Sequence, residues 1–161
     1  MATMEIINKI LLNGQFSILK SFLFANNLPW FYQDEMVQGD NGWFSHCFYN
    51  NHSPQSEGFN SVVPLLEELE VKALVEVTAK CLIKSEKQYQ SKMHRDKPFD
   101  CKTAIVYMNT CNGYTIVDYD NKLHNVPCEE NKALVFDSKL LHSSVSQTDT
   151  KRRIIININY F

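Results

Sequence analysis

The second half of the chain is a succession of short segments with strand character, separated by turn-forming pairs of residues. Strand candidates cover residues 103–109, 114–119, 122–126, 133–137, 140–145 and 153–160. The turns between them are Asn112-Gly113, Asp120-Asn121, Glu130-Asn131 and Thr148-Asp149. Short strands at regular spacing are typical of a sandwich or a double-sheet barrel. The pattern therefore predicts a mainly β, jelly-roll-like (cupin-like) domain.

The first half of the chain predicts packing helices and supporting strands. Expected strands cover residues 4–12, 30–32, 43–49 and 75–83, and expected helices cover 15–25 and 61–69. The aromatic runs 30–32 and 43–49 are expected to pack a sheet against the first helix, with a substrate platform as the alternative. In the segment 75–83, apolar residues alternate with polar ones, which indicates a strand with one buried face. We expect one α+β domain over 1–161, with 1–87 supporting a β core at 88–161.

Composition narrows the range of partners and compartments. Sixteen basic and 18 acidic residues give a net charge of −2. The sequence has no basic stripe of the kind that binds nucleic-acid phosphate, so nucleic acid is not expected to be the main partner. Five cysteines without a Cys-x-x-Cys motif favour free thiols in a reducing compartment. No apolar run approaches the roughly 20 residues of a membrane span, and residues 1–12 do not suit a signal peptide. The prediction is a cytoplasmic protein without a membrane partner.

Three residues could form a metal site. His94 and Asp96 stand two positions apart, so in a strand both side chains would point to the same side. His142, on a later strand, could supply a third ligand. Two histidines and one carboxylate on one face of a metal leave the opposite positions open, as in non-haem iron(II) oxygenases. His124 could replace His142, but no basic residue follows it at the right distance.

A basic residue follows the second histidine across one turn. Arg153 opens the last strand, where it shares a face with Ile155, Asn157 and Asn159. An inward-facing arginine is costly unless an anion pairs with it. The distal carboxylate of a dicarboxylic co-substrate would serve, with bidentate geometry. Arg152, on the opposite face, is the second choice.

From about residue 88 to 161 the sequence resembles the 2-oxoglutarate- and iron(II)-dependent dioxygenases, especially their prolyl-4-hydroxylase-like branch. The matching elements are His94-x-Asp96, Thr103-Ala-Ile-Val-Tyr107-Met-Asn109, Asn112-Gly113-Tyr-Thr115, Phe136-Asp137-Ser138 before His142, and Arg153. The N-terminal half, with Pro29-Trp30 and Trp43-Phe-Ser-His46, resembles small bacterial and phage-type members.

The resemblance implies a double-stranded β-helix in which His94, Asp96 and His142 bind Fe(II). Arg153 and Tyr107 would bind the distal carboxylate of 2-oxoglutarate. The implied reaction uses O2, decarboxylates 2-oxoglutarate to succinate and CO2, and hydroxylates an unactivated C–H bond. Ascorbate is expected to stimulate turnover. The acid at position 96 argues against halogenation, because related halogenases have a small residue there.

The implied substrate is a protein side chain such as proline, or a small molecule, selected by loops 33–42 and 50–60 and by residues near 88–92. One alternative is oxidative dealkylation of nucleic acid, but the dealkylases carry a second arginine where this chain has Asn159. Another is a cupin-like zinc-binding or hydrolytic domain, since zinc competes well for such ligands. A purely structural jelly roll is the third.

Overall fold

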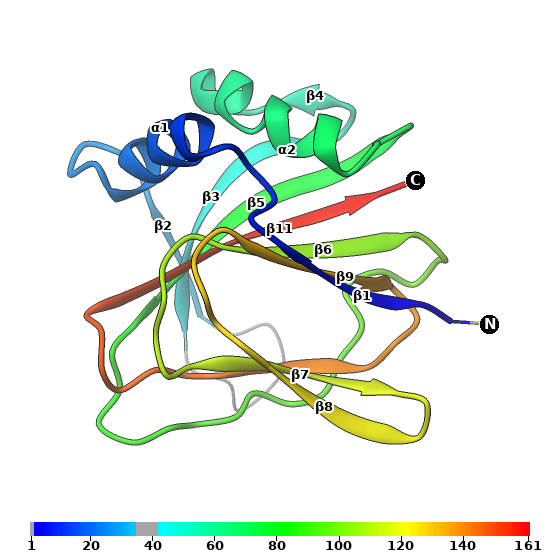
Figure 1. Cartoon of the computed structure of the whole chain (residues 1–161). Helices are drawn as coiled ribbons and strands as arrows, with labels where there is room; N and C mark the ends of the chain where they lie inside the picture. The colour runs from blue at the N-terminus through cyan, green and yellow to red at the C-terminus, as the bar shows by residue number, and fades with distance from the viewer. Residues whose placement is uncertain (1, 35–41) are drawn as a thin grey trace.

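The computed structural model of the chain describes residues 2–34 and 42–161, which form two facing β-sheets and a layer of helices (Figure 1). The larger sheet has the order β1-β9-β6-β11-β5-β3-β2, with β4 beside β3, and the smaller sheet has the order β10-β7-β8. The strands are β1 (Met4–Asn8), β2 (Phe31–Gln33), β3 (Trp43–Asn50), β4 (Ser53–Pro54), β5 (Leu74–Ile83), β6 (Lys102–Tyr107), β7 (Tyr114–Tyr119), β8 (Lys122–Pro127), β9 (Lys132–Asp137), β10 (His142–Val145) and β11 (Arg152–Tyr160). The helical segments are α1 (Asn13–Phe24), a 3₁₀ turn η1 (Glu57–Ser61) and α2 (Val63–Glu68).

The predicted mainly β fold with packing helices is confirmed. Paired strands run antiparallel, and the smaller sheet covers one face of the larger one (Figure 1). The β7–β8 hairpin closes through Asp120 and Asn121, whose φ angles are 52° and 57°. Two consecutive left-handed residues are what a two-residue hairpin turn requires, and Asp and Asn tolerate that conformation.

The helices cover the outer face of the larger sheet (Figure 1). In α1, Phe16, Leu19 and Leu23 are buried at helical spacing. They pack against outward-facing residues of the sheet in one hydrophobic cluster, which includes Phe48 and Ile156. Neither helix of the described chain has the length and the apolar run that a bilayer crossing needs.

Several predicted boundaries change in the structure. The strand expected over 4–12 ends at Asn8, because Lys9 adopts a left-handed φ of 54°. The expected loop 33–42 and its turn-forming cluster lie mostly outside the described residues, which resume at Gly42.

The aromatic residues of β3 separate by face. Phe44 and Phe48 join the cluster under α1, as expected. His46 lies on that face too, where Pro29 O and Ser56 Oγ hydrogen-bond its two ring nitrogens, so its role is structural. Trp43 instead lines the space between the sheets. The aromatic run thus contributes both to packing and to the cavity wall.

Asp137 anchors the N-terminal strand to the larger sheet. Its carboxylate accepts hydrogen bonds from the Thr3 backbone at 2.8 Å and from Lys102 Nζ at 2.5 Å. Partial burial opposes ionisation, but these hydrogen bonds outweigh it and lower the pKa of Asp137.

A lowered carboxyl pKa stabilises the folded state above the ordinary carboxyl range, and that contribution disappears as pH falls through the folded-state pKa. Asp137→Asn should therefore cost about 0.5–1 kcal/mol of unfolding free energy at pH 7, typical of a surface ion pair. Urea unfolding of both proteins as a function of pH tests this. An unchanged difference at low pH would show that the ion pair is not the cause.

Candidate metal centre

Backbone pairing brings the two candidate histidines together. His94 N donates to His142 O at 2.9 Å, and His142 N donates to His94 O at 3.0 Å, which forms an isolated antiparallel bridge. The two imidazole rings lie side by side, with their centroids 4.5 Å apart. His142 begins β10 of the smaller sheet, so the loop that carries His94 extends that sheet at its edge.

Asp96 completes the cluster. Its Oδ1 lies 3.6 Å from His94 Nε2 and 3.5 Å from His142 Nε2, and the three ligand atoms lie within 4.8 Å of one another. Ligands about 2.0–2.2 Å from one metal ion would be separated by roughly 3 to 3.5 Å, so a small contraction suffices. Asp96 lies in a bend instead of the strand that the His-x-Asp spacing predicted, because only His94 pairs with the smaller sheet.

Unsatisfied polar atoms fit a metal ion at this place. Among the described residues, Asp96 Oδ1 is buried and has no hydrogen-bond partner. Buried polar atoms are nearly always satisfied, so an oxygen of this kind indicates a missing ligand. On the outer side, His94 Nδ1 hydrogen-bonds Lys92 O at 3.0 Å. A metal-bound imidazole usually donates its other N–H to such a carbonyl.

Electrostatics keep the carboxylate charged. Burial opposes ionisation of Asp96, but the adjacent imidazoles of His142 and His94 and the positive charge of Lys80 outweigh it. The pKa of Asp96 therefore lies well below its ordinary value. Burial lowers the pKa of His94, but the adjacent Asp96 carboxylate and the hydrogen bond to Lys92 O more than offset this, so the net shift is upward.

Asn157 of β11 orients the acid, a role that the sequence did not indicate. Its Nδ2 donates to Asp96 Oδ2 at 2.7 Å and leaves Oδ1 for a metal. Removing such a supporting contact typically weakens metal binding about 10- to 100-fold. Asn157→Ala should show this loss in a competition titration against a chelator. Asn159→Ala is the matched control, because Asn159 donates to Thr103 and not to Asp96. Equal affinities for both variants would contradict the orienting role.

Arg153 is fully buried behind the cluster, on the inward face of β11 as predicted. Its guanidinium donates to Ser144 Oγ at 2.8 Å, to Val145 O at 2.9 Å and to Thr115 Oγ1 at 3.4 Å. All of these acceptors are neutral, and no carboxylate of residues 2–34 or 42–161 pairs with it. A buried cation without a counter-ion is unfavourable, so this place favours an anion.

Tyr107 lies beside this guanidinium, which is 5.9 Å from the centre of its ring. The Tyr107 hydroxyl donates to Thr115 Oγ1 at 2.9 Å. Burial raises the pKa of Tyr107 far above its ordinary value, so the hydroxyl stays protonated. Thr115 thus accepts from both Tyr107 and Arg153, which leaves its own O–H free to donate to a ligand.

A cavity of about 90 Å³ joins the metal cluster to the region of Arg153. His94 and His142 line one part of it, and Thr115 and Ser144, the hydrogen-bond partners of Arg153, line another. Its remaining lining is largely apolar and includes Ile105 and Ile155. Two of the sequence-predicted ligands and two hydrogen-bond partners of Arg153 therefore border one small space. Gly113 packs closely against this region, and a Cβ added to it would lie 2.9 Å from Val145 O. This close approach explains why the Asn112-Gly113 turn has a glycine at its second position.

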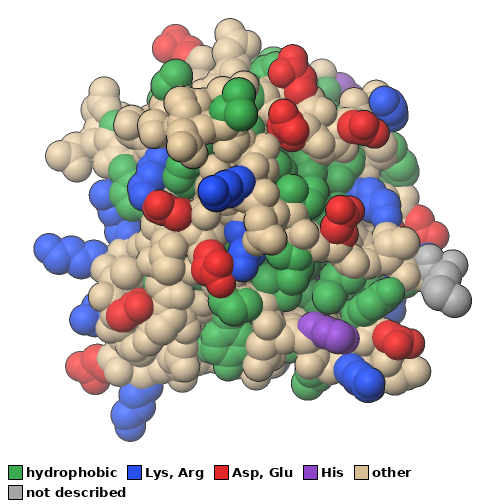
Figure 2. Space-filling model, viewed as in Figure 1, with side chains coloured by type: hydrophobic (Ala, Val, Ile, Leu, Met, Phe, Trp, Pro, Cys, Tyr) green, Lys and Arg blue, Asp and Glu red, His purple; other side chains and the backbone are tan. Residues whose placement is uncertain are grey.

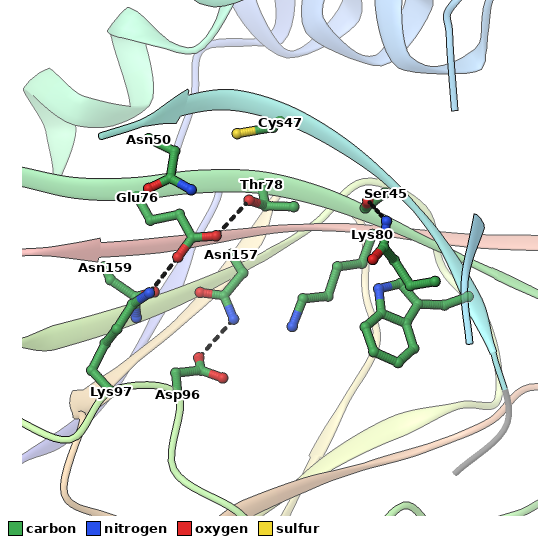
Figure 3. Close-up of a pocket in the computed structure, with 12 residues that line it drawn as sticks. Ser45, Cys47, Asn50, Glu76, Thr78, Lys80, Asp96, Lys97, Asn157 and Asn159 are labelled. Atoms are coloured by element: carbon green, nitrogen blue, oxygen red, sulfur yellow. Dashed lines mark hydrogen bonds and ion pairs between the residues drawn. The ribbon is translucent and has the colours of Figure 1, made fainter. Parts of the chain in front are cut away.

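Other residues considered from the sequence lie elsewhere. Arg152 stacks its guanidinium 5.0 Å from the ring of Phe24, on the helix side of the sheet. His124 of β8 hydrogen-bonds Tyr119 O at 3.1 Å. The single buried face predicted for residues 75–83 is confirmed, and the polar face of β5, which carries Lys80, is directed into the space between the sheets (Figure 3). Alternation identifies two faces of a strand, but it does not tell a solvated face from a polar cavity wall.

Solved structures share this architecture. A prolyl hydroxylase from Trichoplax adhaerens, in complex with a peptide of a hypoxia-inducible factor, is 16% identical, with a TM-score of 0.69 over 98% of this chain and 83% of that one. A prolyl-4-hydroxylase from Pseudomonas putida is 13% identical, with a TM-score of 0.69 over 99% of this chain and 92% of that one. HygX from Streptomyces hygroscopicus, with nickel and 2-oxoglutarate bound, is 12% identical, with a TM-score of 0.67 over 99% and 82%.

The sequence matches no protein-family model and no curated protein. The structural likeness establishes the fold, which is the double-stranded β-helix of the 2-oxoglutarate- and iron(II)-dependent oxygenases, with prolyl hydroxylases among the similar structures. The candidate cluster of His94, Asp96 and His142 links the two sheets, because His142 belongs to the edge strand β10 of the smaller sheet and Asp96 hydrogen-bonds Asn157 in the larger one.

Proposed function

We propose that the protein is a 2-oxoglutarate- and Fe(II)-dependent dioxygenase that hydroxylates an unactivated C–H bond and decarboxylates 2-oxoglutarate to succinate and CO2. The observation that carries this proposal is the buried, unpaired Arg153 beside a His-Asp-His cluster, with a small cavity between them. A co-substrate with a carboxylate at one end and a metal-binding oxo acid at the other satisfies both ends of the cavity.

The side chains have distinct roles in this proposal. His94, Asp96 and His142 hold the metal, and iron(II), when bound, supplies the redox chemistry with oxygen. Arg153 binds the distal carboxylate of 2-oxoglutarate, and Tyr107 supports it through Thr115. The apolar lining excludes water from the space in which the co-substrate reacts.

The alternatives fit the structure less well. A hydrolytic zinc domain would use the same three ligands but gives no role to the buried charge of Arg153. For nucleic-acid dealkylation, the second arginine is absent, and Asn159 instead donates to Thr103. On the face shown in Figure 2, basic and acidic side chains are interspersed and form no basic stripe.

The substrate and the setting belong to the same proposal. A protein side chain such as proline, or a small molecule, would approach the cluster from the open side of the two sheets. Five free cysteines, four of them buried, fit a reducing compartment such as the cytoplasm. Ascorbate is proposed to stimulate turnover by keeping iron reduced.

Succinate formation tests the reaction class. The protein supplied with iron(II), 2-oxoglutarate and air should form succinate slowly without added substrate, with matching oxygen uptake. The isosteric variant Asp96→Asn should lose this activity, whereas His124→Ala should keep it, because the His124 ring hydrogen-bonds Tyr119 O and does not belong to the cluster. Succinate formation that is equal in Asp96→Asn and wild type would contradict the assignment.

A further inference from the structure

A second and larger cavity, of about 270 Å³, adjoins the metal cluster at Asp96 (Figure 3). Asp96 and Asn157 belong to its wall, so a molecule held there would lie next to the metal. Most of its lining residues are of polar type, and they come from five segments of the chain: Gln33, Trp43, Ser45, Cys47, Asn50, Glu76, Thr78, Lys80, Asp96, Lys97, Asn157 and Asn159.

Only two of the four charged side chains in this cavity form an ion pair with each other. Glu76 pairs with Lys97 and also accepts a hydrogen bond from Thr78 Oγ1 at 3.1 Å. Asp96 belongs to the metal cluster. Lys80 is left over, and within residues 2–34 and 42–161 its ammonium has no hydrogen bond and no ion pair. Figure 3 shows its amino group pointing into the open space above Asp96.

The strand position of Lys80 explains why its side chain is held in the cavity. β5 is an inner strand of the larger sheet, with Ile155 of β11 on one side and Ser45 of β3 on the other side of Lys80. Its ammonium lies 6.0 Å from the centre of the Trp43 ring. A half-buried ammonium beside an aromatic ring and without an ion-pair partner is well placed to bind an anion.

Hydrogen-bonding groups surround this charge. Asn157 lines both cavities, and its Oδ1 has no hydrogen-bond partner among the described residues. It therefore offers an acceptor to an N–H or O–H donor. Asn50, Asn159 and Ser45 add further neutral polar groups to the same wall. A molecule with one anionic group and at least one donor would match the lining better than an apolar one.

We propose that this cavity binds the primary substrate, a small carboxylic acid with an amino or hydroxyl donor, such as a free amino acid or hydroxy acid, whose carboxylate pairs with Lys80. This inference rests on the proposed oxygenase function. The volume suits a small molecule, since it lies near the lower end of typical ligand pockets of about 300–1,000 Å³. Because Lys80 borders both cavities, it could instead serve the co-substrate, and the test separates these two roles.

Trp43 provides a local reporter that does not depend on turnover. The chain has two tryptophans, so the background substitution Trp30→Phe leaves Trp43 as the only one. The full chain, loaded with zinc(II) to prevent turnover and with 2-oxoglutarate, is titrated with free L-amino acids, with α-hydroxy acids and with their primary amides. We expect at least one acid to change the fluorescence with saturation, and its primary amide, which lacks the carboxylate, to bind about tenfold more weakly or not at all.

Variants assign the effect to Lys80. Lys80→Met and Lys80→Gln should weaken binding of that acid about tenfold or more, because its carboxylate loses its partner. Lys84→Met, on an exposed lysine just past the end of the same strand, should bind it as wild type does. The affinity for 2-oxoglutarate, titrated separately, should change less than about threefold in the Lys80 variants.

Three results would overturn the proposal. In the first, no acid in the panel changes the Trp43 fluorescence. In the second, acids bind equally well to wild type and to both Lys80 variants. In the third, the Lys80 variants lose affinity mainly for 2-oxoglutarate, which would make Lys80 a co-substrate anchor. Failure of the oxygenase proposal has a different signature, because the wild-type protein would then fail to bind 2-oxoglutarate at all.

Discussion

Replacing His142 with alanine should abolish metal binding and succinate formation while the chain still folds. The imidazole is one of three side chains that converge on the candidate metal position, and the remaining two ligands cannot hold the ion with useful affinity. We expect metal affinity to fall by about 100-fold or more, beyond the loss typical of a supporting contact. The backbone bridge between residues 94 and 142 does not depend on the side chain.

Metal content after dialysis, together with thermal unfolding, checks this result. His142 is buried and its ring lies 4.9 Å from that of Phe136, so the truncation leaves a cavity and should lower the free energy of unfolding by about 1–3 kcal/mol. Asp96→Asn keeps the side-chain volume and separates ligation from packing. If His142→Ala retained the metal or made succinate at the wild-type rate, His142 would not be a ligand.

Replacing Arg153 with methionine should remove 2-oxoglutarate binding and leave metal binding in place. Truncating one partner of a buried charge pair costs about 2–5 kcal/mol, which corresponds to a fall in affinity of about 30-fold or more. The stability of the variant without co-substrate should change much less, because Arg153 has no charged partner in the absence of 2-oxoglutarate. The unfolding free energy of Arg153→Met should therefore stay within about 2 kcal/mol of wild type.

Arg152→Met is the matched control for this experiment. Arg152 precedes Arg153 on the same strand, but its guanidinium packs on Phe24 outside the cavity. Isothermal titration of the zinc-loaded proteins with 2-oxoglutarate should therefore give wild-type affinity for Arg152→Met. Unchanged affinity in Arg153→Met, or a loss confined to Arg152→Met, would show that the co-substrate anchor lies elsewhere.

Much of the fold follows from local patterns in the sequence. Short segments of strand character between turn-forming pairs predict the strands of 103–160, and β6, β7, β8, β9 and β11 follow that prediction closely. The strand expected over 140–145 begins only at His142, where pairing with β7 begins. Local propensity does not specify where a partner strand starts, so boundaries of this kind depend on tertiary pairing.

Site residues could be predicted from the sequence where the chemistry requires a particular residue type. They could not be predicted where the role of a residue depends on its position in the fold. An arginine on the inward face of a strand indicates an anion, and the structure places Arg153 there. By contrast, Lys80 and Asn157 look like ordinary polar residues of alternating strands. Their roles depend on a loop between β5 and β6 that brings Asp96 under the sheet, and no local spacing encodes that crossing.

The most direct test of the central claim is an anaerobic titration of the iron(II)-loaded protein with 2-oxoglutarate, followed by visible absorption. The proposed site predicts a weak charge-transfer band that grows and saturates in wild type, is absent in His142→Ala and needs much more 2-oxoglutarate in Arg153→Met. If the iron(II)-loaded wild-type protein showed no such band, the cluster and Arg153 would not form a 2-oxoglutarate site, and the oxygenase proposal would be wrong.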